Sequence, residues 1–347
     1  MDKKIKVAVL GATGSVGQKF IELLNNHPWF EVAEVAASER SAGKTYREAT
    51  NWFMSTPMPE SVANLIVKEC KVPLESKILF SGLDANVAGE IETEFAKNGF
   101  VVISNARNHR FDNDVPLLVP EVNHQHLDIV SKQNYNGGII VTNPNCSTVG
   151  LVMALKPIHD LFGITEVNVV TMQALSGAGY PGVPSLDIID NLIPFIGGEE
   201  HKMETEPLKI LGGLSEDGFV SASMAISAQC NRVAVLDGHT ESVQIRTAKK
   251  ASAEEIIEAW KSFSAMPQEL QLPYAPVHPL YYFENERYPQ PRLHRNLEKG
   301  MAVSIGRLRP CSLFDWKFTV LSHNTVRGAA GGAILNAELM VKKGLIN

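Results

Sequence analysis

The sequence has few cysteines and no long apolar run. Its four cysteines, Cys70, Cys146, Cys230 and Cys311, form no C-x-x-C pair and have no histidine at zinc-finger spacing, which argues against a disulfide framework or a structural zinc site. The apolar run near the N-terminus extends only over residues 7–10, too short for a signal peptide or a membrane span. We therefore expect a reduced, cytoplasmic protein with no metal site and no membrane contact.

Positive charge is also not in excess. The 347 residues carry 32 Lys and Arg against 38 Asp and Glu, a net charge of −6, which argues against a nucleic-acid partner. Internal repeats and low-complexity tracts are missing as well. The apolar fraction of 44% excludes global disorder, and the length predicts two domains.

The first third of the chain alternates short apolar runs with helical stretches, which is typical of a parallel sheet with helices on both faces. Because each run is brief and bounded by polar or glycine residues, we interpret the runs as buried strands. Strands are predicted at Ile5–Leu10, Val32–Ala37, Ile78–Phe80, Val101–Ser104 and Ile139–Thr142, and helices at Ser15–Asn26 and Asn86–Asn98.

The chain becomes richer in β-type segments from Val167 onward, which predicts an α+β second domain with a mostly antiparallel or mixed sheet. A final helix is predicted over Thr325–Lys343, capped by Asn324 or Thr325 and stopped by Gly344. Three glycines in its first turns suggest close packing against another backbone or a cofactor. The β-type segments are Val167–Leu175, Phe219–Asn231, Gly238–Lys249, Val303–Pro310 and Trp316–Ser322.

A glycine-rich turn follows the first predicted strand and opens the first predicted helix. Gly11 suits the tight turn, Gly14 allows the backbone to approach a pyrophosphate, and Gly17 lets the helix pack closely on the sheet. The helix N-terminus attracts the phosphate charge. These features predict a dinucleotide site.

The segment after the second predicted strand indicates which dinucleotide is bound. Ser38 and Arg40 can hold a 2′-phosphate, whereas Glu39 could serve the ribose of NAD if it faced inward. We favour NADP.

Cys146 differs from the other cysteines because it lies at the start of a predicted helix, Thr148–Phe162, which Pro157 should kink or break. The helix dipole and its N–H groups favour a thiolate and can stabilise an oxyanion. Cys146 is therefore a candidate nucleophile. Cys70 is expected to be exposed, and Cys230 and Cys311 are expected to be packing residues.

Four segments, taken together and in this order, resemble the aspartate-β-semialdehyde dehydrogenase family, in the branch found in archaea, fungi and some bacteria. The resemblance covers nearly the whole chain. The segments are Gly11-Ala12-Thr13-Gly14-Ser15-Val16-Gly17, Ser104-Asn105-Ala106-Arg107, Pro144-Asn145-Cys146-Ser147-Thr148 and Leu236-Asp237-Gly238-His239-Thr240.

The resemblance implies an α/β fold: a Rossmann-type nucleotide-binding domain followed by an α+β catalytic and dimerisation domain of the glyceraldehyde-3-phosphate-dehydrogenase-like type. The domains would comprise residues 1–145 with 324–347, and residues 146–323. It also implies a homodimer or homotetramer.

The resemblance further implies a reversible reaction. A cysteine attacks L-aspartyl-4-phosphate and expels phosphate, and NADPH reduces the thioacyl-enzyme to L-aspartate-4-semialdehyde. The reaction belongs to the biosynthesis of lysine, diaminopimelate, threonine, methionine and isoleucine, and phosphate is the co-substrate in the reverse direction.

By resemblance, Cys146 is the nucleophile, His239 moves a proton on and off the hemithioacetal oxygen, and Gln173 orients the substrate. The guanidinium of Arg232 suits the α-carboxylate. The remaining substrate-binding residues are Asn105, Arg107, Asn145, Glu200 (for the ammonium group) and Lys202 (for phosphate), and the cofactor-binding residues are Gly11, Thr13, Gly14, Ser15, Val16, Ser38, Arg40, Ser41, Ser176, Gly177 and Asn324.

Several alternatives stay open. A malonyl-CoA or succinyl-CoA reductase would use the same cysteine and histidine, but CoA needs no Glu200 to hold an ammonium group. A noncatalytic NADP-binding protein would keep the glycine loop without needing the thiol. The run that contains Glu200 also fits a solvent-exposed helical face, Arg110 is close enough to be confused with Arg107, and His109 fits no pattern.

Overall fold

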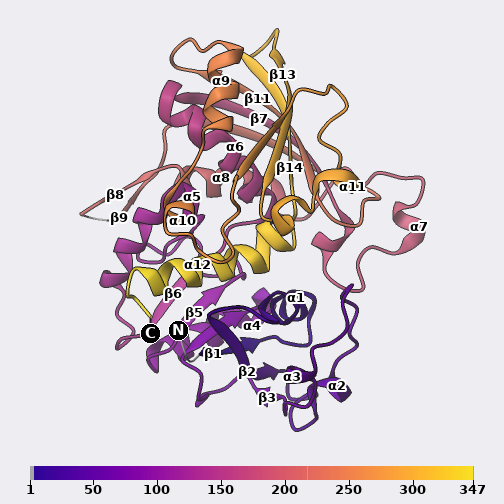
Figure 1. The fold of residues 1–347 in the computed structure, drawn as a ribbon, viewed down its shortest axis with the longest axis vertical. Helices are drawn as coiled ribbons and strands as arrows, with labels where there is room; N and C mark the ends of the chain where they lie inside the picture. The colour runs from indigo at the N-terminus through magenta and orange to yellow at the C-terminus, as the bar shows by residue number, and fades with distance from the viewer. Residues whose placement is uncertain (1–3, 217, 347) are drawn as a thin grey trace. The chain divides into compact units, whose positions relative to one another are not determined.

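The structure is a computed structural model that describes residues 4–216 and 218–346, and the chain divides into two compact units (Figure 1). The first unit comprises Met1–Leu118, Gln125–Asn143 and Ala329–Asn347, and the second comprises Val119–His124 and Pro144–Gly328. The sequence-based boundaries at 145/146 and 323/324 thus move to 143/144 and 328/329. Among the residues described, no helix is long and apolar enough to cross a membrane.

The first unit contains a parallel six-stranded sheet in the order β3-β2-β1-β4-β5-β6. The strand order reverses between β1 and β4, the point at which doubly wound folds bind ligands at the carboxyl ends of their strands. The strands are β1 (Ile5–Leu10), β2 (Phe30–Ala37), β3 (Lys68–Glu69), β4 (Ile78–Ser81), β5 (Val101–Ser104) and β6 (Ile139–Thr142).

Helices cover both faces of this sheet. Leu79 on β4 belongs to the same core cluster as Phe95, while the next residue, Phe80, packs on Phe20 with ring centroids 5.1 Å apart. Successive strand residues point to opposite faces, so the helices that carry Phe95 and Phe20 lie on opposite sides. The helices of this unit are α1 (Ser15–Leu24), α2 (Tyr46–Ala49), α3 (Glu60–Ala63), α4 (Ala85–Lys97) and α12 (Gly331–Lys342).

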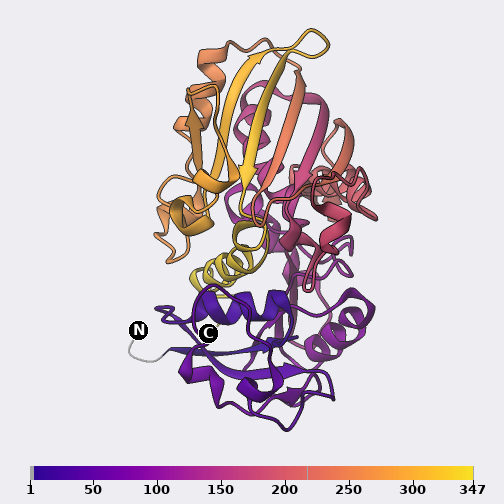
Figure 2. The ribbon, with the colours of Figure 1, turned by 90° about the vertical axis from the view of Figure 1, so that its right-hand side faces the viewer.

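The second unit contains a mixed six-stranded sheet in the order β10-β7-β11-β14-β13-β12, as expected for an α+β domain. Its long strands run side by side in Figure 2, and a separate hairpin pairs β8 with β9. The strands are β7 (Ile164–Gln173), β8 (Gly213–Ser215), β9 (Gly218–Val220), β10 (Ala225–Arg232), β11 (His239–Thr247), β12 (Leu280–Phe283), β13 (Val303–Pro310) and β14 (Trp316–Ser322).

One face of this second sheet packs against α6, which contacts β7, β11, β13 and β14. The residues that alternate with the buried ones, such as Val170, Met172 and Ser242, are half-buried. The helical segments of this unit are α5 (Pro120–Asn123), α6 (Cys146–Phe162), α7 (Ser185–Ile188), α8 (Glu199–Ile210), α9 (Ala253–Lys261), α10 (Met266–Glu269), α11 (Pro291–His294) and 3₁₀ turns at Leu175–Ala178 and Leu297–Gly300. The 3₁₀ segment His124–Lys132 continues into the first unit, as does the π-helix Val326–Ala330.

Two helix predictions need correction. Pro157 does not break α6, which continues to Phe162; Pro157 is itself buried, and tertiary packing outweighs the hydrogen bond that proline cannot donate. The final helix begins as a π-helix, and the side chain of Asn324 hydrogen-bonds the Gly238 N–H and Ser176 instead of capping it. Gly344 follows its end with φ +71°, as expected for a C-terminal stop.

The four cysteines are free. Cys230 is buried as expected, but the predicted exposure of Cys70 is wrong, because its side chain packs against the core of the first unit. Cys311 is only partly buried, and the Phe314 and Leu313 N–H groups lower the pKa of its thiol. It therefore lies in a turn and is not a core residue.

Candidate active site

Cys146 is the first residue of α6, where the sequence placed it. The Asn145 side chain caps this helix: its Oδ1 accepts hydrogen bonds from the Ser147 and Thr148 N–H groups at 2.9 and 3.4 Å. The Asn145 Nδ2 donates to Glu199 at 2.7 Å. Both ends of the Asn145 side chain thus fix the helix start, and its predicted contact with substrate stays a prediction.

His239 contacts Cys146 directly, with Nε2 3.1 Å from Sγ. The opposite ring nitrogen, Nδ1, accepts a hydrogen bond from the Ala174 N–H at 3.0 Å. A neutral imidazole whose Nδ1 is an acceptor carries its proton on Nε2. His239 therefore points an N–H donor at the Cys146 sulfur.

The charge state of His239 agrees with that tautomer. Burial, together with the positive charge of Arg232 and the neighbouring His323, lowers the pKa of His239 to about 3. A second proton would also displace the Ala174 N–H from Nδ1. The lowered pKa therefore favours a neutral ring.

The β-sheet register brings the predicted site residues into one row at the ends of neighbouring strands. Arg232 lies opposite Gln173 on the parallel pair β10 and β7, and His239 begins β11 opposite Ser322 of β14. Arg232 Nη1 donates to the Ala174 carbonyl at 2.6 Å. Strand ends that are distant in sequence thus converge around Cys146.

Glu199, the first residue of α8, lies beside these strand ends. The residue predicted from the sequence was its neighbour Glu200. Glu199 accepts hydrogen bonds from Asn145, from Gln173 at 3.2 Å and from Lys202 at 2.6 Å. Burial opposes its ionisation, but Lys202 and the amide donors outweigh burial and lower the pKa of Glu199. Glu200 instead accepts the Cys230 N–H at 3.2 Å.

The spacing along α8 could have indicated Glu199, because it lies three residues before Lys202 and pairs with it on one helix face. Two other buried acids were missed. Glu206 accepts the Asn145 N–H at 2.6 Å, and Glu241 lies two residues after His239, on the buried face of β11. A carboxyl group on the apolar side of an alternating strand is a signal visible in sequence.

Two glycines lie in close contact with Cys146, His239 and Arg232. A Cβ at Gly177 would lie 2.9 Å from Arg232 Nη1 and 3.2 Å from His239 Nε2, and a Cβ at Gly328 would lie 2.8 Å from Cys146 Cβ. Ser176, next to Gly177, accepts a hydrogen bond from Asn324 Nδ2 at 2.8 Å. These close contacts explain why a side chain at either glycine would displace reacting groups.

The glycine-rich turn lies in the first unit and is built as the sequence predicted. Gly11 has φ +70°, and a Cβ there would lie 2.7 Å from the Gly82 carbonyl. A Cβ at Gly17 would lie 2.2 Å from the Gly11 carbonyl. Gly14 precedes α1 without a side-chain cap, and its own Cβ would meet only Gly11 O at 3.4 Å. The turn therefore leaves the start of α1 open to a phosphate group.

The segment after β2 favours a 2′-phosphate. Ser38 and Arg40 are exposed, and Ser41 is partly exposed. Glu39 lies 3.2 Å from Lys71 in an exposed ion pair, which occupies the carboxylate that could have served NAD. The residues present therefore fit NADP.

A loop that follows β5 separates Arg107 from Arg110. Arg107 is exposed, whereas Arg110 is buried and donates to the Asn105 carbonyl at 2.9 Å. Asn105 Oδ1 accepts a hydrogen bond from Asn143 at 2.9 Å. Arg110 thus supports the loop, and Arg107 is the arginine that can reach a ligand.

A thiol at a helix start, an imidazole nitrogen on its sulfur and a doubly wound sheet with a glycine-rich turn are typical of a nucleotide-dependent oxidoreductase. Among the described residues, no group of three or more His, Cys, Asp or Glu could hold a metal ion. Family models support this class. The semialdehyde dehydrogenase NAD binding domain matches residues 6–130, and the semialdehyde dehydrogenase dimerisation domain matches residues 155–327.

Comparison with individual proteins identifies one family within this class. The aspartate-semialdehyde dehydrogenases of Schizosaccharomyces pombe and Methanothermobacter thermautotrophicus are each 50% identical, over 98% and 97% of this chain and 99% of each relative. The Candida albicans enzyme solved with NADP covers 99% of this chain and 100% of its own at 44% identity, with a TM-score of 0.91. The chain therefore belongs to the aspartate-semialdehyde dehydrogenase family.

A more distant structure has the same fold. Aspartate semialdehyde dehydrogenase II of Vibrio cholerae, solved as a complex with ASA, is 28% identical over 98% of this chain and 99% of its own, with a TM-score of 0.78.

Proposed function

We propose that this chain catalyses the reversible, NADP-dependent reductive dephosphorylation of L-aspartyl-4-phosphate to L-aspartate-4-semialdehyde through a thioester on Cys146. The observation that carries the proposal is the 3.1 Å contact between Cys146 Sγ and His239 Nε2 at the start of α6. The family membership and the surrounding charged groups support an amino-acid substrate.

Three charged groups beside this pair match the three charges of the substrate. Arg232 binds the α-carboxylate with its planar guanidinium. Glu199, which is buried and ionised, takes the ammonium role that the sequence analysis gave to Glu200. Lys202, 2.6 Å from Glu199, supports the phosphate. A CoA thioester would offer no cation to Glu199, which disfavours the acyl-CoA alternative.

NADP accepts or supplies the hydride when bound. The open start of α1 at Gly14 holds the pyrophosphate, with Thr13, Ser15 and Val16 around it. Ser38, Arg40 and Ser41 hold the 2′-phosphate. Ser176, Gly177 and Asn324 approach the nicotinamide.

Inorganic phosphate is the co-substrate in the oxidative direction. Asn105 and Arg107 lie at the carboxyl end of β5, and the exposed guanidinium of Arg107 suits a phosphate group. Asn143 holds the side chain of Asn105 and Arg110 holds its carbonyl, so the Arg107 guanidinium stays available for the phosphate.

His239 acts as a hydrogen-bond donor, which revises its predicted role as proton carrier. The Cys146 thiolate adds to the aldehyde carbon, and its negative charge moves to the carbonyl oxygen. The Nε2–H of His239 then stabilises that oxyanion. Because the thiolate brings the charge, the addition needs no proton transfer, and the lowered pKa of His239 keeps Nε2–H in place.

We also propose that the half-buried face of the second sheet forms the interface of a homodimer, with a homotetramer as a further assembly. The dimerisation-domain match over residues 155–327 supports oligomerisation. A catalytic thiol requires reducing surroundings, which favours a cytoplasmic location.

The decisive experiment supplies purified protein with L-aspartate-4-semialdehyde, NADP and phosphate, and separately with malonate semialdehyde, NADP and CoA. NADPH formation in the first assay supports the proposal, and turnover only in the second would overturn the substrate. Cys146→Ala should abolish NADPH formation while NADP binding, followed by calorimetry, is retained. A Cys146→Ala variant that turns over at a wild-type rate would refute the thioester.

A further inference from the structure

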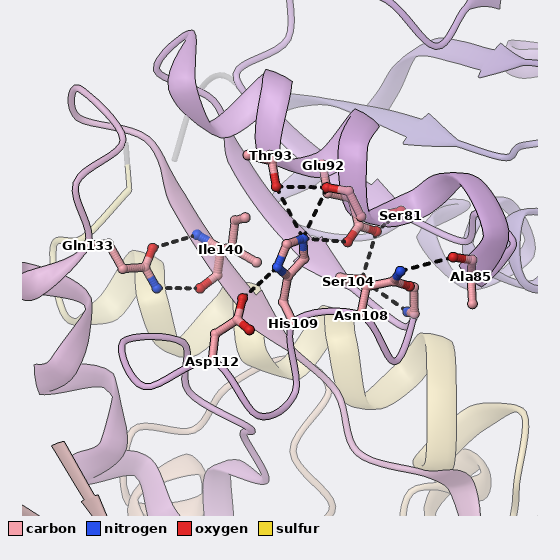
Figure 3. A network of polar contacts seen from close by, with 12 residues as sticks. Ser81, Ala85, Glu92, Thr93, Ser104, Asn108, His109, Asp112, Gln133 and Ile140 are labelled. Atoms are coloured by element: carbon pink, nitrogen blue, oxygen red, sulfur yellow. Dashed lines mark hydrogen bonds and ion pairs between the residues drawn. The ribbon is translucent and has the colours of Figure 1, made fainter. Parts of the chain in front are cut away.

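The carboxylate of Glu92 lies beside Ser81, Ser104 and His109 in the first unit (Figure 3). Glu92 projects from α4 and is completely buried. Its Oε1 accepts a hydrogen bond from the Ser81 hydroxyl at 2.6 Å and another from the Ser104 hydroxyl at 2.7 Å. Ser81 and Ser104 lie opposite each other as the last residues of β4 and β5. One carboxylate oxygen therefore joins the carboxyl ends of two adjacent strands.

The Ser104 hydroxyl also organises the loop that follows β5. It accepts a hydrogen bond from the Ala106 N–H at 3.0 Å while donating to Glu92. Ala106 lies between Asn105 and Arg107, the two residues proposed to bind phosphate. The orientation of this loop thus depends on where Glu92 holds the Ser104 hydroxyl.

The Ser81 hydroxyl marks the end of β4, next to the glycine-rich turn. The following residue, Gly82, donates its N–H to the Leu10 carbonyl at 2.9 Å. The Gly82 carbonyl is packed so closely on Gly11 that a Cβ at Gly11 would lie 2.7 Å away. A shift of Ser81 is therefore transmitted to the turn that faces the dinucleotide.

His109, which the sequence analysis could not place, encloses Glu92 from the side (Figure 3). Its Nε2 lies 3.9 Å from Glu92 Oε2, and its Nδ1 lies 2.7 Å from Asp112. Burial raises the pKa of Glu92, although both serine hydroxyls and His109 favour its ionised form. The serines thus share Oε1, while Oε2 is buried without a hydrogen-bond partner among the described residues.

We propose that Glu92 is a positioning residue that sets the dinucleotide turn through Ser81 and the phosphate loop through Ser104. The inference rests on the proposed function, because it assigns phosphate to Asn105 and Arg107. Glu92 takes no part in bond making. It holds the Ser104 hydroxyl, which orients the loop with Asn105 and Arg107. It also holds the Ser81 hydroxyl, next to Gly82, on which the glycine-rich turn packs.

The two hydroxyls allow the two effects to be separated. Ser104→Ala should raise the KM for phosphate by about three- to tenfold, the loss of roughly one hydrogen bond, and leave the Kd for NADP unchanged. Ser81→Ala should raise the Kd for NADP by a similar factor and leave the KM for phosphate unchanged. A purely structural role would lower the unfolding temperature of both variants without this division, and that result would overturn the proposal.

Variants of Glu92 complete the test. Glu92→Gln keeps an oxygen that can accept both hydroxyls, so it should retain both wild-type constants. Glu92→Leu should raise the KM for phosphate and the Kd for NADP together, while the rate of Cys146 alkylation by iodoacetamide is unchanged. Glu90→Leu, at an exposed position on the same helix, is the matched control. If Glu92→Leu does not fold, the serine variants decide alone.

Arg107→Gln separates this proposal from the proposed function. If it raises the KM for phosphate while the serine and Glu92 variants change neither constant, the positioning role is refuted and the phosphate assignment stands. If Arg107→Gln has no effect on that KM but Ser81→Ala weakens NADP binding, the phosphate assignment fails and the role of Glu92 toward the dinucleotide turn stands.

Discussion

His239 and Glu241 point to the same buried face of β11, and burial disfavours the charged form of each: it lowers the pKa of His239 and raises that of Glu241. His239 has its Nδ1 occupied by the Ala174 N–H and its Nε2 directed at Cys146. Glu241 lies opposite Thr171, two residues along β11 from His239. Burial raises the pKa of Glu241 well above 4.5.

Replacing His239 distinguishes a donor from a proton carrier. His239→Gln keeps an N–H donor but cannot take up a proton, whereas His239→Ala has neither property. We expect kcat to fall about 100-fold in the alanine variant, the cost of one oxyanion donor, and about tenfold or less in the glutamine variant. Equal losses in both variants would show that proton transfer is the essential role.

The pH dependence gives a second check on His239. Arg232, His323 and Cys146 lie around the ring. The pKa of about 3 predicts that His239 does not change its charge between about pH 5 and 9. Nitrogen NMR of histidine-labelled protein, assigned with His239→Gln, should show Nδ1 unprotonated and Nε2 protonated throughout. A proton on Nδ1 at neutral pH would contradict the assignment.

Glu241→Gln should stabilise the protein increasingly as the pH rises. The pKa of Glu241 is raised in the folded state. Its contribution to the free energy of unfolding is therefore fully present below the pKa that the group has in the unfolded chain, and it declines as the pH rises toward the folded-state pKa. Glutamine does not ionise and avoids that loss. The Tm difference between the variant and the wild type should be larger at pH 8 than at pH 5, measured by calorimetry.

Glu254→Gln, at an exposed position, serves as the control for Glu241 and should show no such trend. A Tm difference that is the same at both pH values would mean that Glu241 ionises in the folded protein as easily as in the unfolded chain.

Helix α6 depends on its neighbours for the position of its first residue. Asn145 caps the helix, Glu206 and Glu199 hold Asn145, and Gly328 packs on Cys146. The residue before Gly328, Arg327, forms a buried two-point ion pair with Glu121 at 2.7 and 2.5 Å. The ion pair thus fixes the π-helix that contains Arg327 to α5, and Gly328 allows the close approach to Cys146 at the start of α6.

Gly328→Ala should displace Cys146 and slow the reaction. The added Cβ would lie 2.8 Å from the backbone oxygen and the Cβ of Cys146, so one of the two segments must shift. A displacement of about 1 Å at a reacting atom can cost up to about 100-fold in rate. We expect kcat and the rate of Cys146 alkylation to fall together.

Gly213→Ala is the control for this variant, since a Cβ there meets nothing within 4 Å. It should leave both rates unchanged. Wild-type kinetics in a folded Gly328→Ala protein would show that the π-helix does not position the nucleophile.

The chain as a whole separates its tasks between two units. The first carries the glycine-rich turn and the loop proposed to bind phosphate, and the second carries Cys146, His239 and the charged groups proposed to bind the substrate. The second sheet is covered by α6 on one face, while Val170, Met172 and Ser242 lie half-buried on the other. A sheet face of this kind is suited to pairing with a second copy.

Val170→Arg should therefore weaken the proposed dimer. A charge at this half-buried position would be desolvated in the interface without a partner, which costs several kcal/mol. Sedimentation velocity at one protein concentration should show a shift toward monomer. Val277→Arg, at a position that is 72% exposed, should sediment like the wild type, and an unchanged Val170→Arg dimer would move the interface elsewhere.

The local sequence predicted the bounds of several strands. Strands at Ile5–Leu10, Val101–Ser104, Ile139–Thr142, Val303–Pro310 and Trp316–Ser322 have the predicted bounds, because runs of β-branched and apolar residues between turns determine their ends. The position of Cys146 at a helix start was likewise visible. Pro157 misled the prediction because only packing shows that a helix tolerates it.

The sequence by itself predicted the two-part organisation, the glycine-rich turn and the position of Cys146 at a helix start, and its resemblance to a family pointed to His239 and Arg232. Only the tertiary structure decided which nitrogen of His239 bears the proton, that Glu199 and not Glu200 faces the site, and that Glu92 joins two loops. Those properties depend on hydrogen bonds between residues dozens of positions apart. Strand register and burial create such contacts, and neither follows from local pattern.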